Sequence, residues 1–576
     1  MLNPQSSLLN PDAKSASLSA RAADVVLHGG KIITVNAGFA IAEAVAIAGN
    51  RIAYVGADAG ALAMADARTQ VIDLKGRAVM PGLIDGHAHM DREGLKQVFP
   101  SLANARSVAE VKSLVAELAR RTPKGEWIVT MPLGDPPYYF DVPECYAEKR
   151  LPTRRDLDEA APDHPVYIRP IWGFWRHTTP LVSVANSRAL ALAGITRNTV
   201  APSDTVVIDK DAAGEPTGIF YDNTIMSVVE MTLMRAATGF SLEDRTRTLP
   251  VAMRAYHAFG TTSIFEEHGV AGELLRAYKI VRESGAQTMR ATLVISPKWN
   301  AAAVEKFEPV VEAWASWLAG RGFGDDWLRV SGVFVDIGPS REDELRAGTW
   351  PYTGWAGFNF ATGLARERAK ELCLACAKHK IRVVAIWPNM LEVFDEVNRE
   401  IDITGQRWVL GHISALTPAQ IAKVRELGLV VTSHTNRYVF KEGHLLKQKL
   451  GPERENEIAP LKSLIEAGVR VALATDNVPN SMFYPVWQSI FRRNRYTGEV
   501  VAPAQALTRE QALRAATING AYVTWEEDCK GSIEVGKLAD LAVLSHDPLT
   551  ADEEVLKDIC AEMTFVDGRM VYSAQR

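Results

Sequence analysis

Residues 79–90 constrain this chain more than any other stretch, because two histidines follow an apolar run there. The stretch reads Val-Met-Pro-Gly-Leu-Ile-Asp-Gly-His-Ala-His-Met. In an extended strand, side chains two positions apart project to the same side. His87 and His89 therefore present both imidazoles to one side at the end of a buried strand. This arrangement chelates a divalent metal ion, so it predicts a metal site at the end of that strand.

Composition limits the class of protein. The 576 residues are enough for one large core and a satellite domain. Hydrophobic residues make up 47%, charged residues 23%, and the formal net charge is -5, which excludes a disordered chain and a nucleic-acid binder with a broad basic surface. No apolar run approaches the roughly 18 residues of a membrane span, and residues 1–22 lack the pattern of a signal peptide.

Cysteine usage points to a reducing compartment. The chain has five cysteines, an odd number scattered over its length, which argues against a disulfide framework. We therefore expect a cytoplasmic protein that takes a small-molecule substrate and binds neither nucleic acid nor a membrane. Whether it forms a homo-oligomer is left open.

The pattern of apolar runs divides the chain into three parts. Residues 1–22 are rich in Ser, Asn and Ala and predict a flexible N-terminal arm. Short strand-like runs in residues 23–80 and again in residues 527–576 predict one discontinuous β domain. Between them, residues 81–526 alternate apolar runs with amphipathic helical stretches, which is typical of a parallel α/β architecture. A segment near residues 132–155 interrupts this alternation and is predicted to be an insertion.

Two helix starts are marked by capping residues. Thr417 is a predicted N-cap, Pro418 the first helical residue and Gly428 the stop. Thr508 and Gln511 form a predicted capping box that opens a second helix.

Polar side chains also follow several later apolar runs. The carboxyl ends of parallel strands meet at one edge of a sheet, so such residues are expected to gather there. The candidates are His412 after Trp-Val-Leu-Gly, His434 after Leu-Val-Val-Thr-Ser, Asp476 after Val-Arg-Val-Ala-Leu-Ala-Thr, and Glu266, Glu267 and His268 after Thr-Ser-Ile-Phe.

Several of these motifs resemble one family. Residues 81–89, Pro-Gly-Leu-Ile-Asp-Gly-His-Ala-His, look like the first barrel strand of the amidohydrolase superfamily, and residues 512–522 followed by 531–541 are similar to its closing motif. Residues 177–196 and the shorter motifs at 214–218 and 260–263 most resemble the YtcJ-like branch, amidohydrolase family 3. The resemblance covers nearly the whole chain. It implies a distorted (β/α)8 TIM barrel, flanked by the small β domain, and metal-dependent hydrolysis.

The resemblance also assigns roles to two residues. In the superfamily a histidine closes a late strand and an aspartate closes the last one, serving as metal ligand and as general base for the attacking water. His412 and Asp476 match these positions.

Two positions depart from the branch. Members carry a lysine, carboxylated to bridge two metals, in a strand ending Lys-x-x-x-Asp-Gly, whereas here the strand reads Gly332-Val-Phe-Val-Asp336-Ile. Members also carry a histidine in the next strand, where this chain has Ala385 or Trp387. Asp336 and Asn389 are interpreted as residues that hold loops.

Three arrangements remain compatible with the sequence. One metal ion is bound by His87, His89 and Asp476, with His412 or His434 completing the shell. Alternatively, a second ion is present and a carboxylate replaces the lysine. In the third arrangement metal catalysis has been lost.

For the second arrangement, the residues after Phe265 offer the replacement. Glu266 or Glu267 supplies the bridging carboxylate, and His268 or His434 the lost nitrogen. Strand alternation puts Glu266 and His268 on one face and Glu267 on the other, so we rank the pair Glu266 and His268 higher. Lys298 is a weaker substitute.

The implied function is hydrolysis of a carbon–nitrogen bond in a small amide, carbamate, urea or similar compound. The cofactor is a divalent metal, zinc first, with cobalt, manganese or iron as alternatives, in one or two copies. Asp476 takes the proton of the water, and His412 or His434 stabilises the oxyanion unless it is a ligand. The alternatives are a ring deaminase, or a non-catalytic barrel that binds a ligand.

Aromatic residues near predicted strand ends suggest the kind of substrate. Trp172, Trp175 and His177 lie together in one such segment, and Trp387 follows another apolar run. We expect these side chains to bind the substrate, which favours an apolar or aromatic compound. Ordinary packing between an insertion and the barrel is the competing interpretation.

Overall fold

Eight strands form the centre of the protein, each parallel to its neighbours. In sheet order they are β8 (Leu83–Asp85), β14 (Thr261–Val270), β15 (Arg290–Ile295), β17 (Leu328–Phe334), β20 (Val383–Ala385), β21 (Val409–Leu410), β22 (Val430–Ser433) and β23 (Val471–Leu473). The short strand β16 (Phe323–Gly324) pairs antiparallel with β17. The computed structural model describes residues 22–574 except 140, 172–179, 225, 238, 300–303, 339, 350–352 and 360–361.

The first and last strands of this sheet meet, so the sheet nearly closes. The amide of Gly86, just after β8, donates to the carbonyl of Leu473 in β23 at 3.0 Å. The amide of Asp476 donates to the carbonyl of His87 at 2.9 Å. The predicted distorted (β/α)8 barrel is therefore confirmed.

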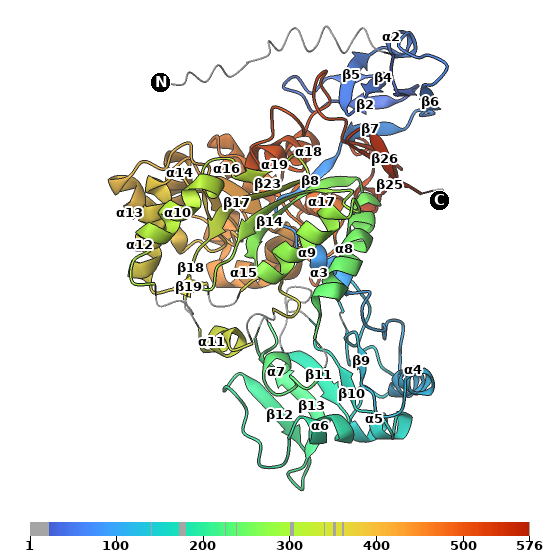
Figure 1. Cartoon of the computed structure of the whole chain (residues 1–576), viewed down its shortest axis with the longest axis vertical. Helices are drawn as coiled ribbons and strands as arrows, with labels where there is room; N and C mark the ends of the chain where they lie inside the picture. The colour runs from blue at the N-terminus through green and yellow to red at the C-terminus, as the bar shows by residue number, and fades with distance from the viewer. Residues whose placement is uncertain are drawn as a thin grey trace.

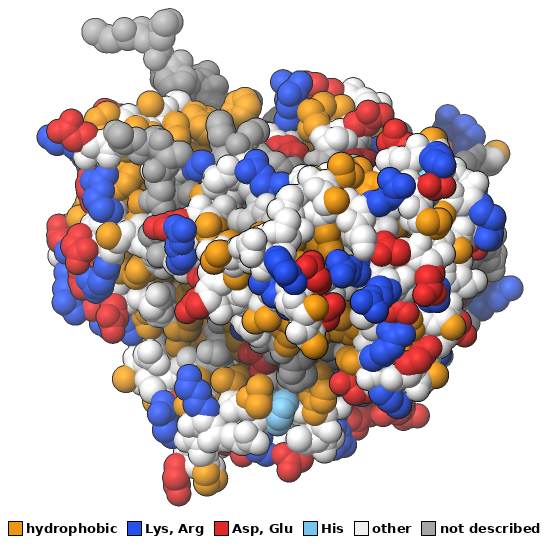
Figure 2. All heavy atoms as spheres, turned by 90° about the horizontal axis from the view of Figure 1, so that it is seen from below, with side chains coloured by type: hydrophobic (Ala, Val, Ile, Leu, Met, Phe, Trp, Pro, Cys, Tyr) orange, Lys and Arg blue, Asp and Glu red, His pale blue; other side chains and the backbone are white. Residues whose placement is uncertain are grey.

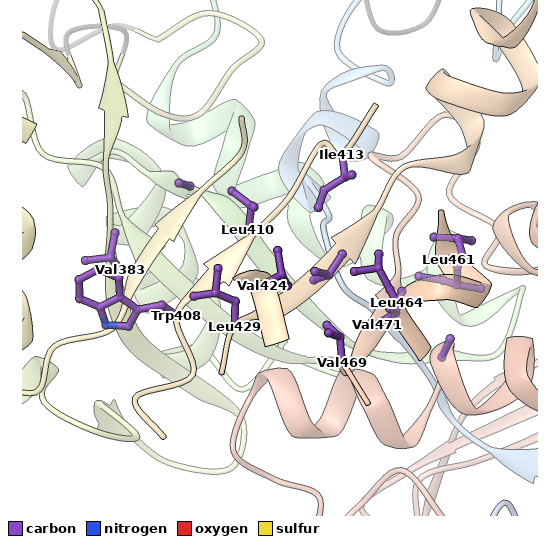
Figure 3. Packing of buried hydrophobic residues seen from close by; sticks show 14 of the residues in the cluster. Val383, Trp408, Leu410, Ile413, Val424, Leu429, Leu461, Leu464, Val469 and Val471 are labelled. Carbon is purple, nitrogen blue, oxygen red and sulfur yellow. The ribbon is translucent and has the colours of Figure 1, made fainter. Parts of the chain in front are cut away.

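Both faces of the barrel strands are apolar. Phe265, Val384 and Ala472 belong to the core inside the barrel. Their neighbours Val383 and Val471 belong to the core between the strands and the surrounding helices. Because both faces are buried, the strands read as continuous apolar runs in the sequence. Figure 3 shows the outer packing, with strand residues such as Leu410 and Val471 lying near Val424 of the helical layer and near Leu461 and Leu464.

Helices alternate with these strands and cover the barrel (Figure 1). The longer ones are α8 (Leu242–His257), α9 (Gly272–Glu283), α10 (Glu308–Leu318), α12 (Arg366–Lys378), α13 (Met390–Glu400), α14 (Pro418–Glu426) and α17 (Phe483–Phe491). Shorter ones are α3 (Met90–Leu95), α11 (Arg341–Ala347), the π-helix η2 (Asn436–Lys441), α15 (Gly443–Leu450), α16 (Leu461–Glu466), α18 (Arg509–Ala515) and α19 (Ile518–Val523).

Both predicted helix starts are confirmed. Thr417 caps α14, where its hydroxyl accepts from the amide of Gln420 and its own amide donates to the Gln420 side chain. Thr508 and Gln511 form the same reciprocal pair at α18. Each box satisfies amide groups that the first helical turn leaves without a backbone partner.

Two small sheets lie at one end of the barrel, and the second of them joins strands from the two ends of the chain (Figure 1). The first has the order β5-β4-β1-β6 and the second the order β26-β25-β24-β7-β2-β3. In the second, β24 pairs antiparallel with both β7 and β25. The strands are β1 (Val25–His28), β2 (Lys31–Ile33), β3 (Ile41–Ala42), β4 (Ala44–Ala48), β5 (Arg51–Gly56), β6 (Gln70–Asp73), β7 (Ala78–Pro81), β24 (Leu541–Leu544), β25 (Ala561–Val566) and β26 (Arg569–Ser573).

A buried ion pair ties these sheets to the barrel, and we expect its removal to destabilise the fold. Arg290, the first residue of β15, donates two hydrogen bonds to Asp540 at 2.7 and 3.0 Å, and both side chains are at most 4% exposed. Asp540→Ala leaves the buried guanidinium with one carboxylate partner, Asp567 at 3.0 Å, so the free energy of unfolding should fall by about 3 kcal/mol, the lower end for a broken buried pair, measured by urea denaturation. Glu117→Ala, which removes an exposed pair with Arg121, is the control and should not move the midpoint. An unchanged midpoint in Asp540→Ala would contradict this role.

A third sheet lies at the opposite end of the molecule, between α3 and α8 in the chain (Figure 1). Its order is β12-β13-β11-β10-β9, and only β9 and β10 pair in parallel. Its strands run from Ile128 to Asp222, so the region extends well beyond the insertion expected near residues 132–155. The strands are β9 (Ile128–Thr130), β10 (Val166–Ile168), β11 (Leu181–Ala185), β12 (Val206–Lys210) and β13 (Pro216–Asp222), and the accompanying helices are α4 (Val108–Arg121), α5 (Arg154–Ala160), α6 (Ser187–Leu192) and α7 (Val228–Met231).

The surface on the side of this third sheet carries charges of both signs. Figure 2 shows Lys and Arg side chains interspersed with Asp and Glu over the described part of that face. Within the residues that the structure describes, every helix is too short or too polar to span a lipid bilayer.

Candidate metal centre

The barrel closure positions the two histidines of the His-x-His motif. His87 and His89 follow β8 directly and are 0% and 2% exposed. Just before them, the carboxylate of Asp85 accepts hydrogen bonds from the amide of His87 at 3.1 Å and from the amide of Thr475 at 3.0 Å, as well as from the Thr475 hydroxyl. Asp85 therefore ties the end of β8 to the end of β23 and brings both histidines next to Asp476.

Three donor atoms converge beside this closure. His87 Nε2 and His89 Nε2 are 3.0 Å apart, and Asp476 Oδ1 lies 3.8 Å from the first and 3.4 Å from the second. Donors held about 2.0–2.1 Å from one ion in a tetrahedral shell lie about 3.3 Å from each other. The three measured separations lie just below and just above that value. The two imidazole nitrogens and the carboxylate oxygen therefore fit around a single divalent ion.

The two glutamates of β14 lie on opposite sides of the His-x-His motif. Glu267 Oε2 accepts from Nδ1 of His87, and Glu267 Oε1 accepts from the Thr432 hydroxyl at 2.5 Å. Glu266 Oε2 faces Nδ1 of His89 at 3.5 Å, while its other oxygen accepts from the Met90 amide. Each carboxylate thus lies behind one imidazole and orients its Nε2 toward the other imidazole, as outer carboxylates do at metal sites.

This placement differs from the ranking that strand alternation suggested. Glu267 shares the inner face of the barrel with Phe265, and Glu266 shares the outer face with Ile264. Alternation therefore holds through this part of β14, and it puts Glu267 rather than Glu266 on the inner face of the barrel. The register of β14 then shifts between Glu266 and Val270, and His268 lies with the histidines rather than on the outer face.

Five buried imidazoles make up the cluster. Donor atoms of His87, His89 and His268 lie within 4.8 Å of one another, as do those of His87, His412 and His434. The rings of His412 and His434 are 4.0 Å apart, and Nδ1 of His412 lies 3.3 Å from the hydroxyl of Tyr438. His87 is common to both triads, so it stands at the centre of the cluster.

Burial sets the protonation of these groups. It lowers the pKa of His87 and of His434 to about 4, and raises the pKa of Asp85 to about 7 and of Glu266 to about 8. It also raises the pKa of Glu267. The pKa values of the remaining imidazoles lie well below the usual range, again through burial, in His89, His268 and His412. Neutral imidazoles and a carboxylate are the donors that zinc and similar divalent metals take.

The backbone at two strand ends adopts an uncommon conformation. His412 has φ 49° and Asp476 has φ 52°, both in the left-handed region that residues with a Cβ seldom occupy. Asn477 follows with φ 50°. Such positions cluster at functional sites, where surrounding contacts hold them. The turns that orient His412 and Asp476 are therefore held by surrounding contacts in a backbone conformation that these residue types disfavour.

A cavity of about 360 Å³ adjoins the cluster. Trp387 lines it and packs against His412 with ring centroids 5.2 Å apart, and its role in binding substrate stays a prediction. Trp172, Trp175 and His177 lie outside the described residues.

Lys298, the weaker predicted substitute for the bridging lysine of the family, lies outside both histidine triads. Lys298 donates to the carbonyl of Ala347 at 3.0 Å.

Two residues of the site were missed from the sequence. Arg92, fully buried in α3, places Nη1 3.4 Å from Asp476 Oδ1. Tyr438, in the π-helix η2, contacts His412. Arg92 carries a local signal, because it lies three residues after His89 and so one helical turn beyond the motif. Tyr438 carries none, since a π-helix has no periodicity that marks it.

Comparison with known proteins identifies the family. A family model described as the amidohydrolase family matches residues 70–572. The chain therefore belongs to the amidohydrolase family and is a hydrolase. The predicted membership of the YtcJ-like branch, amidohydrolase family 3, is confirmed.

Relatives are similar over nearly the full length. The N-substituted formamide deformylase of Arthrobacter pascens is 27% identical over 574 residues, which cover 95% of this chain and 98% of the relative. The putative amidohydrolase YtcJ of Bacillus subtilis (strain 168) is 24% identical over 516 residues, 88% of this chain and 90% of its own. The crystal structure of an uncharacterized metal-dependent hydrolase from Pyrococcus horikoshii OT3 has a TM-score of 0.65 and 20% identity, covering 92% of this chain and 99% of that one. This last likeness supports the fold.

Proposed function

We propose that the protein is a metal-dependent hydrolase that cleaves the carbon–nitrogen bond of a small N-substituted amide, with formamides first. The observation that carries the proposal is the convergence of His87 Nε2, His89 Nε2 and Asp476 Oδ1 at 3.0–3.8 Å. Family membership supports the reaction class. The full-length similarity to an N-substituted formamide deformylase supports the choice of substrate class.

We infer that one ion would be held by His87, His89 and Asp476, which leaves a fourth position of a tetrahedral shell for water or substrate. Zinc suits this donor set first. A divalent cation held there supplies Lewis acidity, which lowers the pKa of a water molecule and polarises a carbonyl oxygen. Both oxygens of Glu267 already accept hydrogen bonds, from His87 and from Thr432, which favours one ion over a bridged pair.

The remaining chemistry belongs to the side chains. Asp476 takes the proton of the attacking water and delivers it to the leaving nitrogen, which departs as an amine. Arg92, 3.4 Å from Asp476 Oδ1, holds the carboxylate in place. His412 and His434, whose rings meet the His87 ring edge-on, stabilise the negative charge that develops on the substrate oxygen.

The function is tested with protein purified without a chelating tag. Bound metal is removed with a chelator and zinc is then added back in steps, while released amine is measured with N-substituted formamides, amides, carbamates and ureas. We expect turnover to rise up to one equivalent of zinc per chain and to be fastest with formamides. Release of ammonia from a ring compound would favour a deaminase instead. Metal uptake without turnover of any compound would favour a non-catalytic barrel.

Glu267 provides a test of the metal site that does not depend on turnover. Its carboxylate fixes the tautomer of His87, so that Nε2 faces His89 and Asp476. We expect Glu267→Gln to weaken zinc binding by about 10–100-fold, measured by competition with a chromophoric chelator. Glu266→Gln is the matched control one residue earlier, and its effect should be smaller because Glu266 lies 3.5 Å from the His89 ring nitrogen. Equal affinities in wild type and Glu267→Gln would contradict the orienting role.

A further inference from the structure

The cavity next to the cluster lies between the barrel and the third sheet. The barrel contributes His268, Asp336 and Trp387 to its lining, and the third sheet and its following loop contribute Asn223 and Met226. Its volume of about 360 Å³ lies at the small end of the range of roughly 300–1,000 Å³ typical of small-molecule sites. Because His268 belongs both to the cavity wall and to a histidine triad, a ligand bound here reaches the proposed metal centre.

Two aromatic rings on the cavity wall are fixed by the cluster itself. Phe358 stacks on His268 with ring centroids 3.8 Å apart and an interplanar angle of 14°. Trp387 packs against His412. Together with Ile386 they offer rigid apolar surface to the body of a small ligand.

Asp336 is a lining carboxylate beside Trp387, the residue that packs against His412. It begins the short strand β18 (Asp336–Ile337), just beyond β17. Its carboxylate accepts from the amide of Ile337 at 2.7 Å and from the ring N–H of Trp387, which are both neutral donors. Among the ion pairs of the described residues, none includes Asp336 or the lining carboxylate Glu342, whereas the nearby Asp343 is paired with Arg346 at 3.1 Å.

The electrostatics of the cavity favour a positive charge beside Asp336. Burial, with a smaller contribution from the charge of Asp343, raises the pKa of its carboxyl to about 7. Glu342 adds another acidic side chain to the lining, and Arg346 is the basic one among the described lining residues. A cation next to Asp336 stabilises the ionised form that burial disfavours.

We propose that Asp336 binds a positively charged nitrogen of the substrate. The substrate of the proposed hydrolase is then a small formamide or amide whose apolar body carries an ammonium or amidinium group. This inference rests on the proposed function, because it names the substrate class of the same site. The apolar body lies against Phe358 and Trp387, and the scissile bond faces the side of the cavity that His268 lines.

The test compares two N-substituted formamides of equal length, one ending in a primary ammonium group and the other in a hydroxyl group. We expect the wild type to show a kcat/KM about 10–100-fold higher for the cationic compound, as for a hydrogen bond between charged groups. Asp336→Asn keeps the shape and one acceptor oxygen but removes the charge. It should bring the ratio close to one, mainly through a higher KM for the cationic compound.

Glu342→Gln is the matched control, since it removes one negative charge from the same cavity. Glu342 accepts from the hydroxyl of Thr205 at 3.3 Å, and we expect the preference for the cationic compound to survive its replacement. The wild-type ratio needs no variant, so the test holds even if Asp336→Asn folds poorly. A wild type without preference, or a preference that survives Asp336→Asn, overturns the inference while the hydrolase stands.

Binding separates this inference from the proposed function. Benzylammonium is the probe, and its affinity is measured by calorimetry with the metal-loaded protein. If neither formamide is turned over but benzylammonium binds the wild type at least about tenfold tighter than Asp336→Asn, the proposed function fails and the cation subsite stands. If there is neither turnover nor binding that depends on Asp336, both fail.

Discussion

Asp476→Asn should lower kcat by about 10²–10⁴-fold, the range of a lost general acid–base group, while most of the metal stays bound. The Asn side chain keeps one carbonyl oxygen, which can still face His87 and His89. The same oxygen can accept from Arg92 Nη1, which lies 3.4 Å from Asp476 Oδ1 in the wild type. The amide cannot take the proton of the attacking water, so the loss should fall on kcat. The measurement is steady-state release of amine, with zinc per chain determined on the same sample by elemental mass spectrometry.

A surface carboxylate supplies the control for this variant. Asp528 is exposed, and Asp528→Asn removes the same charge far from the chemistry, so kcat should match the wild type. A wild-type kcat in fully loaded Asp476→Asn would refute Asp476 as the base. A large loss of zinc in that variant would instead show that Asp476 matters mainly as a ligand, and the loss of turnover would then say nothing about proton transfer.

Residues at the ends of the barrel strands are the part of the site that the sequence predicts well. His87, His89, His412, His434 and Asp476 each follow a run of apolar residues. A parallel barrel buries both faces of its strands, so its strands stand out as such runs, and the closed sheet brings their carboxyl ends together. The convergence of these side chains therefore follows from the fold class once that class is known.

The face of a strand that turns inward is harder to predict when both faces are apolar. In β14, Ile264 and Phe265 are both buried, one outside the barrel and the other inside. Hydrophobicity alone does not show which of them shares its face with the site. The sequence ranks Glu266 above Glu267 only because alternation groups Glu266 with His268. The register shift before Val270 has no marker except Gly269, whose φ is +84°.

The third sheet shows a second limit of prediction from one sequence. Its strands, such as β10 and β11, are short buried runs like those of the barrel. Which strands pair is decided by contacts between distant residues, and periodicity within one run carries no such information. The alternation of runs therefore continues through this region, and only the segment near residues 132–155 is seen to depart from it.

Replacement of His89 should distinguish the two histidine triads. His87 belongs to both triads, so its replacement does not distinguish them. His89 belongs only to the triad with His268, and His434 belongs only to the triad with His412. If the ion sits between His87, His89 and Asp476, His89→Ala removes one of about four ligands. A structural zinc site supplies about 10–16 kcal/mol in all, so we expect zinc affinity to fall on the order of 10²–10³-fold.

The same competition assay on His434→Ala completes the argument. This variant should keep zinc affinity within about tenfold of the wild type, because His434 is proposed to act on the substrate oxygen rather than on the ion. His164→Ala is the control for loss of a buried histidine, since the His164 ring contacts the carbonyl of Glu126, just before β9, and should not affect zinc. The reverse pattern, with loss in His434→Ala and none in His89→Ala, would move the ion to the triad with His412. Loss in both, together with two equivalents of zinc in the wild type, would mean that Glu267 lies between two ions and that its hydrogen bond with His87 is replaced when metal binds.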